Sequence, residues 1–245
     1  MSYKIIVMSC DKNYDLWKPF YLCMEKYWKN HPEIIYSTET ITNPYYKTIC
    51  KDIPISGWTK RVYETVKDLE CDNVLLMVDD LFIRQPVNNE LIDSLQDYIG
   101  GIIAGLNLEK SFDNGDIKLD NLVSIRNHYG KWKTSVMCQM WNKKALLDIF
   151  NCEKDAWTFE KDNESRNYIF LISNDGNFID WGYGDRKWFG IRKGKWCKEI
   201  VDFFKKENIQ VDYSVRGFYE WMLLFALWQK MNISISTNGY LIILV

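Results

Sequence analysis

Short apolar segments alternate with helical patterns through the first 106 residues, and this alternation constrains the fold more than any other feature. Residues 3–9, 33–38, 73–78 and 101–106 are nearly continuous runs of aliphatic and β-branched residues, which is typical of strands buried on both faces. Between these runs, apolar residues recur at helical spacing: Leu16, Phe20, Met24 and Tyr27; Trp58, Val62, Val66 and Leu69; Leu91, Leu95 and Tyr98. The pattern predicts an α/β fold with a Rossmann-type, mostly parallel sheet flanked by helices.

The second half of the chain is less regular. Its predicted parts are a polar excursion over 107–131, a strand over 134–141, a helix over 143–150, a loop over 151–167, turns and short strands over 174–196, and helices around 200–204 and 218–228. No repeat or proline-rich linker divides the sequence, so we expect a single domain over residues 1–245 with functionally distinct halves, 1–106 and 107–245.

Composition excludes several classes of protein. The net charge is −2, from 31 basic and 33 acidic residues, so the chain is not a nucleic-acid-binding polycation. Its two histidines stand far apart, which argues against a histidine-rich metal centre. Seven cysteines without a C-x-x-C pair indicate reduced thiols and a cytoplasmic location. No apolar run approaches the roughly 20 residues that span a bilayer.

Polar side chains follow three of the predicted strands: Ser9 and Asp11, Thr38 and Glu39, and Asp79 and Asp80. In a parallel sheet, ligands bind in the crevice beyond the carboxyl ends of the strands. We therefore expect these residues to line a binding site. The alternative is that they only cap helices or form turns.

The segment LLMVDDLFI, residues 75–83, is the strongest single signal. Two adjacent carboxylates at the end of an apolar strand are costly unless something positive neutralises them. Hard oxygen ligands suit a divalent cation, Mg²⁺ or Mn²⁺, which commonly bridges to substrate phosphates. In the competing interpretation, Asp79 pairs with an arginine or caps the next turn.

Five segments in order carry a resemblance to a known family: SCDKNYDLWKPFYLCMEKYW, GWTKRVYETVKDLECDNVLLMVDDLFI, SVMCQMWNKKALLDIF, DAWTFE, and GKW at 194–196. Together they resemble GT-A-fold nucleotide-sugar glycosyltransferases of bacterial surface-polysaccharide gene clusters, those for capsule and O-antigen. Val78 stands at the first position of the family's Asp-x-Asp element, which gives the xDD variant and leaves metal dependence open.

The resemblance implies a role for each matched residue. Asp80 would reach the metal or the diphosphate, and Asp79 would contact the ribose or donor sugar at the catalytic centre. Ser9, Asp11, Thr38 and Glu39 would line the nucleotide pocket. Residues 1–106 would then bind the nucleotide-sugar, and the irregular half, 107–245, would face the acceptor.

Glu160, in DAWTFE, is the expected catalytic base. Trp157 and Phe159 would anchor the loop on either side of Thr158 while Glu160 projects into a cleft, where a carboxylate can deprotonate an acceptor hydroxyl. The alternative is a surface salt bridge to Lys161 or Arg166, and Asp155 is the reserve candidate.

A basic stretch, residues 186–206, contains eight Lys or Arg against two acidic residues. It is interpreted as a diphosphate-gripping lid carrying Arg186, Arg192 and Lys195, as a surface for anionic lipid, or as a solvated face. The aromatic stripe within 218–228 suits core packing, a homo-oligomer contact, or peripheral attachment to a membrane.

Taken together, these features predict a transferase that moves a sugar from a UDP-, GDP- or dTDP-linked donor to a hydroxyl of a glycan or lipid-linked glycan. It would work in the cytoplasm, with the inner face of the membrane as a second possible place of work. An inverting reaction with a carboxylate base is expected, and a retaining enzyme or a non-catalytic sugar- or nucleotide-binding relative stays open. A sugar nucleotidyltransferase would need a glycine-rich basic phosphate loop, which SCDKNYDLW lacks.

Overall fold

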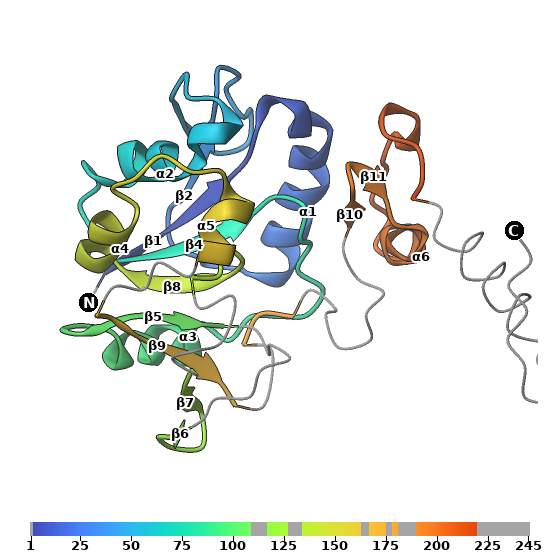
Figure 1. Ribbon diagram of the computed structural model, residues 1–245. Coiled ribbons are helices and arrows are strands. Elements are labelled where there is room, and N and C mark those ends of the chain that lie inside the picture. The colour runs from blue at the N-terminus through green and yellow to red at the C-terminus, as the bar shows by residue number, and fades with distance from the viewer. Residues whose placement is uncertain are drawn as a thin grey trace, which may run out of the picture.

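A computed structural model describes residues 2–108, 117–126, 134–162, 167–174, 178–180 and 190–219. Its centre is a nine-stranded sheet of order β3-β2-β1-β4-β8-β5-β9-β7-β6 (Figure 1). The strands are β1 (Tyr3–Met8), β2 (Ile34–Thr38), β3 (Lys47–Cys50), β4 (Asn73–Val78), β5 (Ile103–Asn107), β6 (Ile117–Lys118), β7 (Val123–Ile125), β8 (Gln139–Asn142) and β9 (Ile169–Ser173). The predicted α/β, mostly parallel architecture is confirmed.

The first half of the sheet is parallel, as the apolar runs predict. β1 lies between β2 and β4, and β3 adds to the outer edge of β2. Because β1, β2 and β4 run in one direction, their carboxyl ends meet at one edge of the sheet.

The second half contains the departures. β8 is antiparallel and lies between β4 and β5, and β9 pairs with β5 in parallel. The strand expected over 134–141 is shorter and later, at Gln139–Asn142, because only this part pairs with both neighbours. The polar excursion expected over 107–131 contains the β6–β7 hairpin, whose β7 pairs with β9.

The described chain has six helices: α1 (Trp17–Tyr27), α2 (Trp58–Val66), α3 (Asn89–Leu95), α4 (Lys143–Ile149), α5 (Ala156–Asp162) and α6 (Lys198–Lys206). Five of them cover the sheet in two layers, while α6 lies in a small carboxyl-terminal unit beside α1 (Figure 1). Short 3-10 turns are η1 (Asp11–Leu16), η2 (Ile55–Gly57), η3 (Gln96–Tyr98) and η5 (Tyr213–Val215). Alternate residues of β1 enter different cores: Ile5 and Val7 belong to the cluster that includes residues of α1 and α3, whereas Ile6 and Met8 belong to the cluster that includes residues of α2, α4 and α5. None of the helices described is both long and apolar enough to cross a membrane.

The segment DAWTFE is not the loop that was predicted: it forms most of α5. Asp155 precedes this helix, and its carboxylate accepts hydrogen bonds from the Thr158 N–H at 2.9 Å and the Thr158 hydroxyl at 2.6 Å. This is how an N-terminal capping residue satisfies unpaired helix donors. The helical turn buries Phe159 and leaves Trp157 68% exposed, so the expected alternation of anchoring aromatics is wrong.

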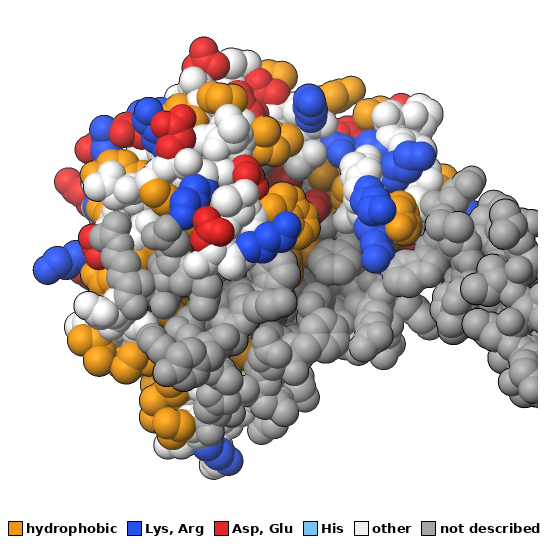
Figure 2. All heavy atoms as spheres, in the orientation of Figure 1, with side chains coloured by type: hydrophobic (Ala, Val, Ile, Leu, Met, Phe, Trp, Pro, Cys, Tyr) orange, Lys and Arg blue, Asp and Glu red, His pale blue; other side chains and the backbone are white. Residues whose placement is uncertain are grey.

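The carboxyl-terminal part of the described chain forms a small unit beside α1 (Figure 1). Strands β10 (Ile191–Arg192) and β11 (Lys195–Trp196) form a hairpin, followed by α6 and η5. Trp196 is fully buried and stacks on Phe82 with ring centroids 6.0 Å apart, and Phe204 packs edge-on against both rings. Figure 2 shows Lys and Arg side chains gathered over this unit, where Lys193 and Lys195 are exposed.

Candidate functional site

The candidate site lies where the carboxyl ends of β1, β2 and β4 meet. Met8 is in register with Ser37 and with Val78, so Ser9, Thr38 and Asp79 emerge side by side. Three segments that lie far apart in sequence therefore contribute to one place, as the parallel arrangement predicts.

Asp79 is held in one orientation by hydrogen bonds to both carboxylate oxygens. The hydroxyl of Ser9 donates to Oδ2, and the side-chain amide of Asn13 donates to Oδ1 at 2.8 Å. The indole N–H of Trp17 in turn donates to Ser9 Oγ at 2.8 Å. The Asp79 side chain is buried, and burial followed by the charge of Asp80 raises its pKa to about 7. Among the described residues its hydrogen-bond partners are thus Ser9 and Asn13, while the charge of an arginine, Arg216, opposes the rise in its pKa.

Asp80 is less enclosed than Asp79. Burial raises its pKa to about 6, and its own backbone N–H and the charge of Arg216 oppose that rise. Within the described ranges no three His, Cys, Asp or Glu side chains come together as a metal cluster. The described residues therefore form no closed all-protein cation cage, and Asp80 is the less enclosed carboxylate available to a cation.

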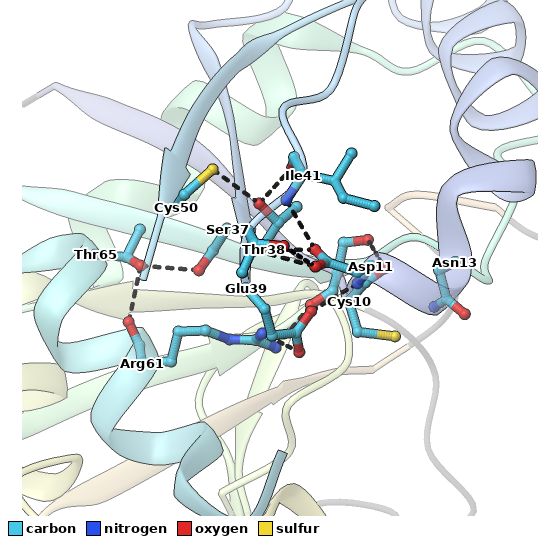
Figure 3. Close-up of polar contacts among 12 residues, drawn as sticks. Cys10, Asp11, Asn13, Ser37, Thr38, Glu39, Ile41, Cys50, Arg61 and Thr65 are labelled. Atoms are coloured by element: carbon cyan, nitrogen blue, oxygen red, sulfur yellow. Dashed lines mark hydrogen bonds and ion pairs between the residues drawn. The ribbon is translucent and has the colours of Figure 1, made fainter. Parts of the chain in front are cut away.

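Asp11 and Glu39 join the loops that follow β1 and β2 (Figure 3). The Asp11 carboxylate accepts from the Thr40 hydroxyl at 2.6 Å and from the Thr40 and Ile41 N–H groups at 3.1 Å. Glu39 Oε2 accepts from the Asp11 N–H at 2.6 Å. Burial pushes the pKa of Asp11 upward, but the hydrogen bonds from Thr40 and Ile41 outweigh it and hold the pKa below its ordinary value. Both carboxylates brace the loops that shape the site.

Arg61 on α2 connects the loop that follows β1 with the loop that follows β2. Its guanidinium is 1% exposed, donates from Nη2 to the Ser9 carbonyl at 2.7 Å, and forms an ion pair with Glu39. Thr65 donates to the Arg61 carbonyl at 2.8 Å and hydrogen-bonds Ser37 at the same distance. Thr38, expected in the pocket, donates its hydroxyl to the Ile41 carbonyl at 2.8 Å.

Glu160 lies on α5, on the sheet face that carries α2 and α4, and is 8% exposed. Its Oε1 accepts the Val136 N–H at 2.8 Å, so its partner is a backbone amide and not Lys161. Burial raises its pKa, and the Val136 N–H and the charge of Arg126 offset this only in part. No contact joins Glu160 to the network around Asp79 among the described residues.

The expected basic contributors are not part of this network. Lys195 is exposed on β11, and Arg192 places its guanidinium 5.1 Å from the ring centre of Tyr219. Arg186 lies outside the described residues, as do Arg166 and the aromatic stripe from residue 220 onward.

Asn13, Arg61 and Arg216 contribute to the network and were not predicted. Asn13 lies close behind the first strand, where the polar run CDKN offered a signal. Arg61 shares the inner face of α2 with Val62 and Thr65, so a charged residue inside an apolar helical stripe marked it. Arg216 comes from 201 residues beyond Asp15, its ion-pair partner, and no local pattern announces such a contact.

The chain matches no family model and no curated protein sequence. Among solved structures it is similar to S. aureus TarS 1–349 in complex with UDP, with a TM-score of 0.48 and 14% identity over 72% of this chain and 58% of that one. It is also similar to a cytidylyltransferase from Leptospira borgpetersenii, with a TM-score of 0.46 and 10% identity over 90% and 99% of the two chains. A CMP:2-keto-3-deoxy-manno-octonic acid synthetase complexed with CTP gives a TM-score of 0.45 and 10% identity over 72% and 92%.

The described topology by itself defines the class of fold: an α/β protein with a mostly parallel sheet and an acidic pair at the carboxyl end of β4. The chain spans a little over half of the TarS structure, 58% of its length. Similarity at these identities and TM-scores says nothing further about activity.

Proposed function

We propose that this protein is a glycosyltransferase that moves a sugar from a nucleotide-diphosphate sugar to a hydroxyl of a glycan acceptor. One observation carries the proposal: Asp79 and Asp80 end a buried strand at the meeting point of three parallel strands, with one carboxylate locked in place and the other left less enclosed. A departing nucleoside diphosphate develops negative charge, and a cation held between Asp80 and its phosphates would stabilise it.

The roles of the protein groups follow from their contacts. Asp79, oriented by Ser9 and Asn13, would accept hydrogen bonds from donor hydroxyls and so set the position of the sugar or ribose. Arg61, Glu39 and Asp11 would keep the pocket walls in place before the donor arrives, which lowers the cost of ordering them on binding.

Glu160 is the proposed base of an inverting transfer. Its raised pKa matches a group that must take a proton from a hydroxyl near neutral pH. Its hydrogen bond to Val136 leaves Oε2 as the oxygen that would receive that proton. A glycan acceptor on a lipid carrier would bring the protein to the inner face of a membrane.

Donor binding is tested by thermal shift and calorimetry with UDP, GDP and dTDP, each with Mn²⁺, with Mg²⁺ and with chelator. We expect one nucleotide to stabilise the protein, and Asp80→Asn to remove the part of the stabilisation that depends on the cation. The matched control is Asp97→Asn, an exposed aspartate in η3, before β5 and away from the site. Absence of a shift with every nucleotide would contradict the proposal.

Turnover separates an enzyme from a binding protein of the same fold. Slow release of free nucleotide from the preferred nucleotide-sugar, without added acceptor, is expected of a catalytic site. Tight nucleotide binding with no release, and no transfer to any glycan, would favour the non-catalytic alternative.

A further inference from the structure

Arg216, just after η5, reaches from the carboxyl-terminal unit into the loop that follows β1. Its Nε and Nη2 donate to the two Asp15 carboxylate oxygens at 2.8 and 2.6 Å, and Nη2 also donates to the Lys12 carbonyl at 2.7 Å. The side chains of this ion pair are 10% and 7% exposed. A two-pronged, largely buried contact of this kind fixes geometry as well as charge.

The same guanidinium is connected to Asp79 through one residue, Asn13. Nη2 donates to Asn13 Oδ1 at 2.9 Å, and the amide Nδ2 of Asn13 donates to Asp79 Oδ1 at 2.8 Å. Because an amide has one acceptor end and one donor end, occupation of Oδ1 by Arg216 determines which way Asn13 turns. The chain of contacts continues from Asp79 through Ser9 to the Trp17 indole.

The carboxyl-terminal unit also approaches the acidic pair closely at Gly190. A side-chain carbon at Gly190 would lie 2.9 Å from the Asp80 carbonyl oxygen and 2.1 Å from the Phe82 ring. Gly190 therefore allows the start of the unit to pack directly against the backbone of the acidic pair.

We infer that Arg216 is a positioning residue: it acts through Asn13 to hold Asp79 in the orientation that receives the donor. The inference rests on the proposed function for the ligand, but the relay itself is a property of the unliganded protein. The carboxyl-terminal unit would thus complete a site built from the first 80 residues.

The relay is tested first without any ligand, by the ¹H–¹⁵N resonance of the Trp17 indole, assigned with Trp17→Phe. We expect Arg216→Met to shift this resonance, Arg216→Lys to shift it less, and Lys205→Met, an exposed control on α6, to leave it in place. In an Asn13→Ala background, Arg216→Met should cause little further shift. A full shift in that background, or none in the single variant, would overturn the inference.

The second arm measures the affinity of the nucleotide that stabilises the wild type. Loss of the relay should weaken binding about tenfold, equivalent to about 1.4 kcal/mol, in Arg216→Met and in Asn13→Ala, with no further loss when the two are combined. Additive losses would contradict action through Asn13. If no nucleotide binds the wild type, the proposed function fails, while the indole resonance still decides the relay.

Discussion

Replacing Arg61 with methionine should destabilise the protein far more than an ordinary loss of one charge on a helix. Methionine keeps an apolar stem inside α2 but removes the ion pair to Glu39 and the 2.7 Å hydrogen bond to the Ser9 carbonyl. Breaking a fully buried pair by removing one partner costs about 3–5 kcal/mol. Glu39 is 19% exposed and keeps the Asp11 N–H, so we expect the lower end, about 3 kcal/mol.

The measurement is urea unfolding followed by tryptophan fluorescence, with an unchanged slope as evidence that the unfolded state is the same. The control is Lys60→Met on the neighbouring residue, whose 3.8 Å pair with Glu153 is exposed on both sides. That change should cost less than about 0.5 kcal/mol. Adding Glu39→Gln to Arg61→Met should recover part of the loss, because no unpaired carboxylate then remains.

A cost for Arg61→Met within about 1 kcal/mol of that for Lys60→Met would refute this reasoning. It would mean that water reaches the guanidinium and that the buried pair is not what braces the strand ends.

Three further outcomes are expected. Glu160→Gln can still accept the Val136 N–H, so it should fold normally yet lose at least about 100-fold in transfer rate, and a near-normal rate would eliminate this base. Because burial raises the pKa of Glu160, the wild-type transfer rate should begin to fall at a pH above the ordinary carboxyl value of 4.5 when the pH is lowered. Gly190→Ala should lower the free energy of unfolding by about 1–3 kcal/mol, because the added carbon overpacks against Phe82 and Asp80. Gly194→Asn, in an open turn, should change the free energy of unfolding in urea very little. Equal losses in the two variants would contradict the close approach at Gly190. Burial raises the pKa of Cys10 to about 11, and the charges of Asp79 and Glu39 add to this effect. Iodoacetamide at pH 8 should therefore modify Cys10 well after the exposed Cys50, and similar modification rates would contradict this.

The first half of the fold was predictable because its strands are buried on both faces. Such strands must be continuously apolar, and β4 is found at the predicted residues, 73–78. The meeting of Ser9, Thr38 and Asp79 followed from parallel topology alone. β6, β7 and β8 are two to four residues long, and a strand that short carries too few residues for a period to show.

The helix at 156–162 was missed for a related reason. Seven residues make about two turns, and only Phe159 and Glu160 of them are buried, so no apolar stripe forms. The cap from Asp155 to Thr158 was visible in the sequence and is the signal that should have outweighed the aromatic alternation.

Which residues stand at strand ends could be inferred, but not what each one contacts. Asp11 and Glu39 were expected to face a ligand. Instead, the Asp11 carboxylate accepts hydrogen bonds from the turn at Thr40, and the Glu39 carboxylate forms an ion pair with Arg61. That outcome depends on loop geometry and on a side chain from a separate helix, neither of which a strand-end pattern encodes.

The antiparallel strand β8 has a consequence for any attempt to dissect this protein. It enters the sheet between β4 and β5, so residues 139–142 supply backbone partners to the strand that bears Asp79 and Asp80. A fragment cut after residue 106 would keep Ser9, Asp79 and Asp80 but lose Arg216, and it would leave one edge of β4 with unsatisfied amides and carbonyls. An exposed strand edge of this kind pairs with strands of other chains, so we expect that fragment to precipitate or self-associate. Transplanting the acidic pair into another scaffold would require carrying this interleaved strand along with it.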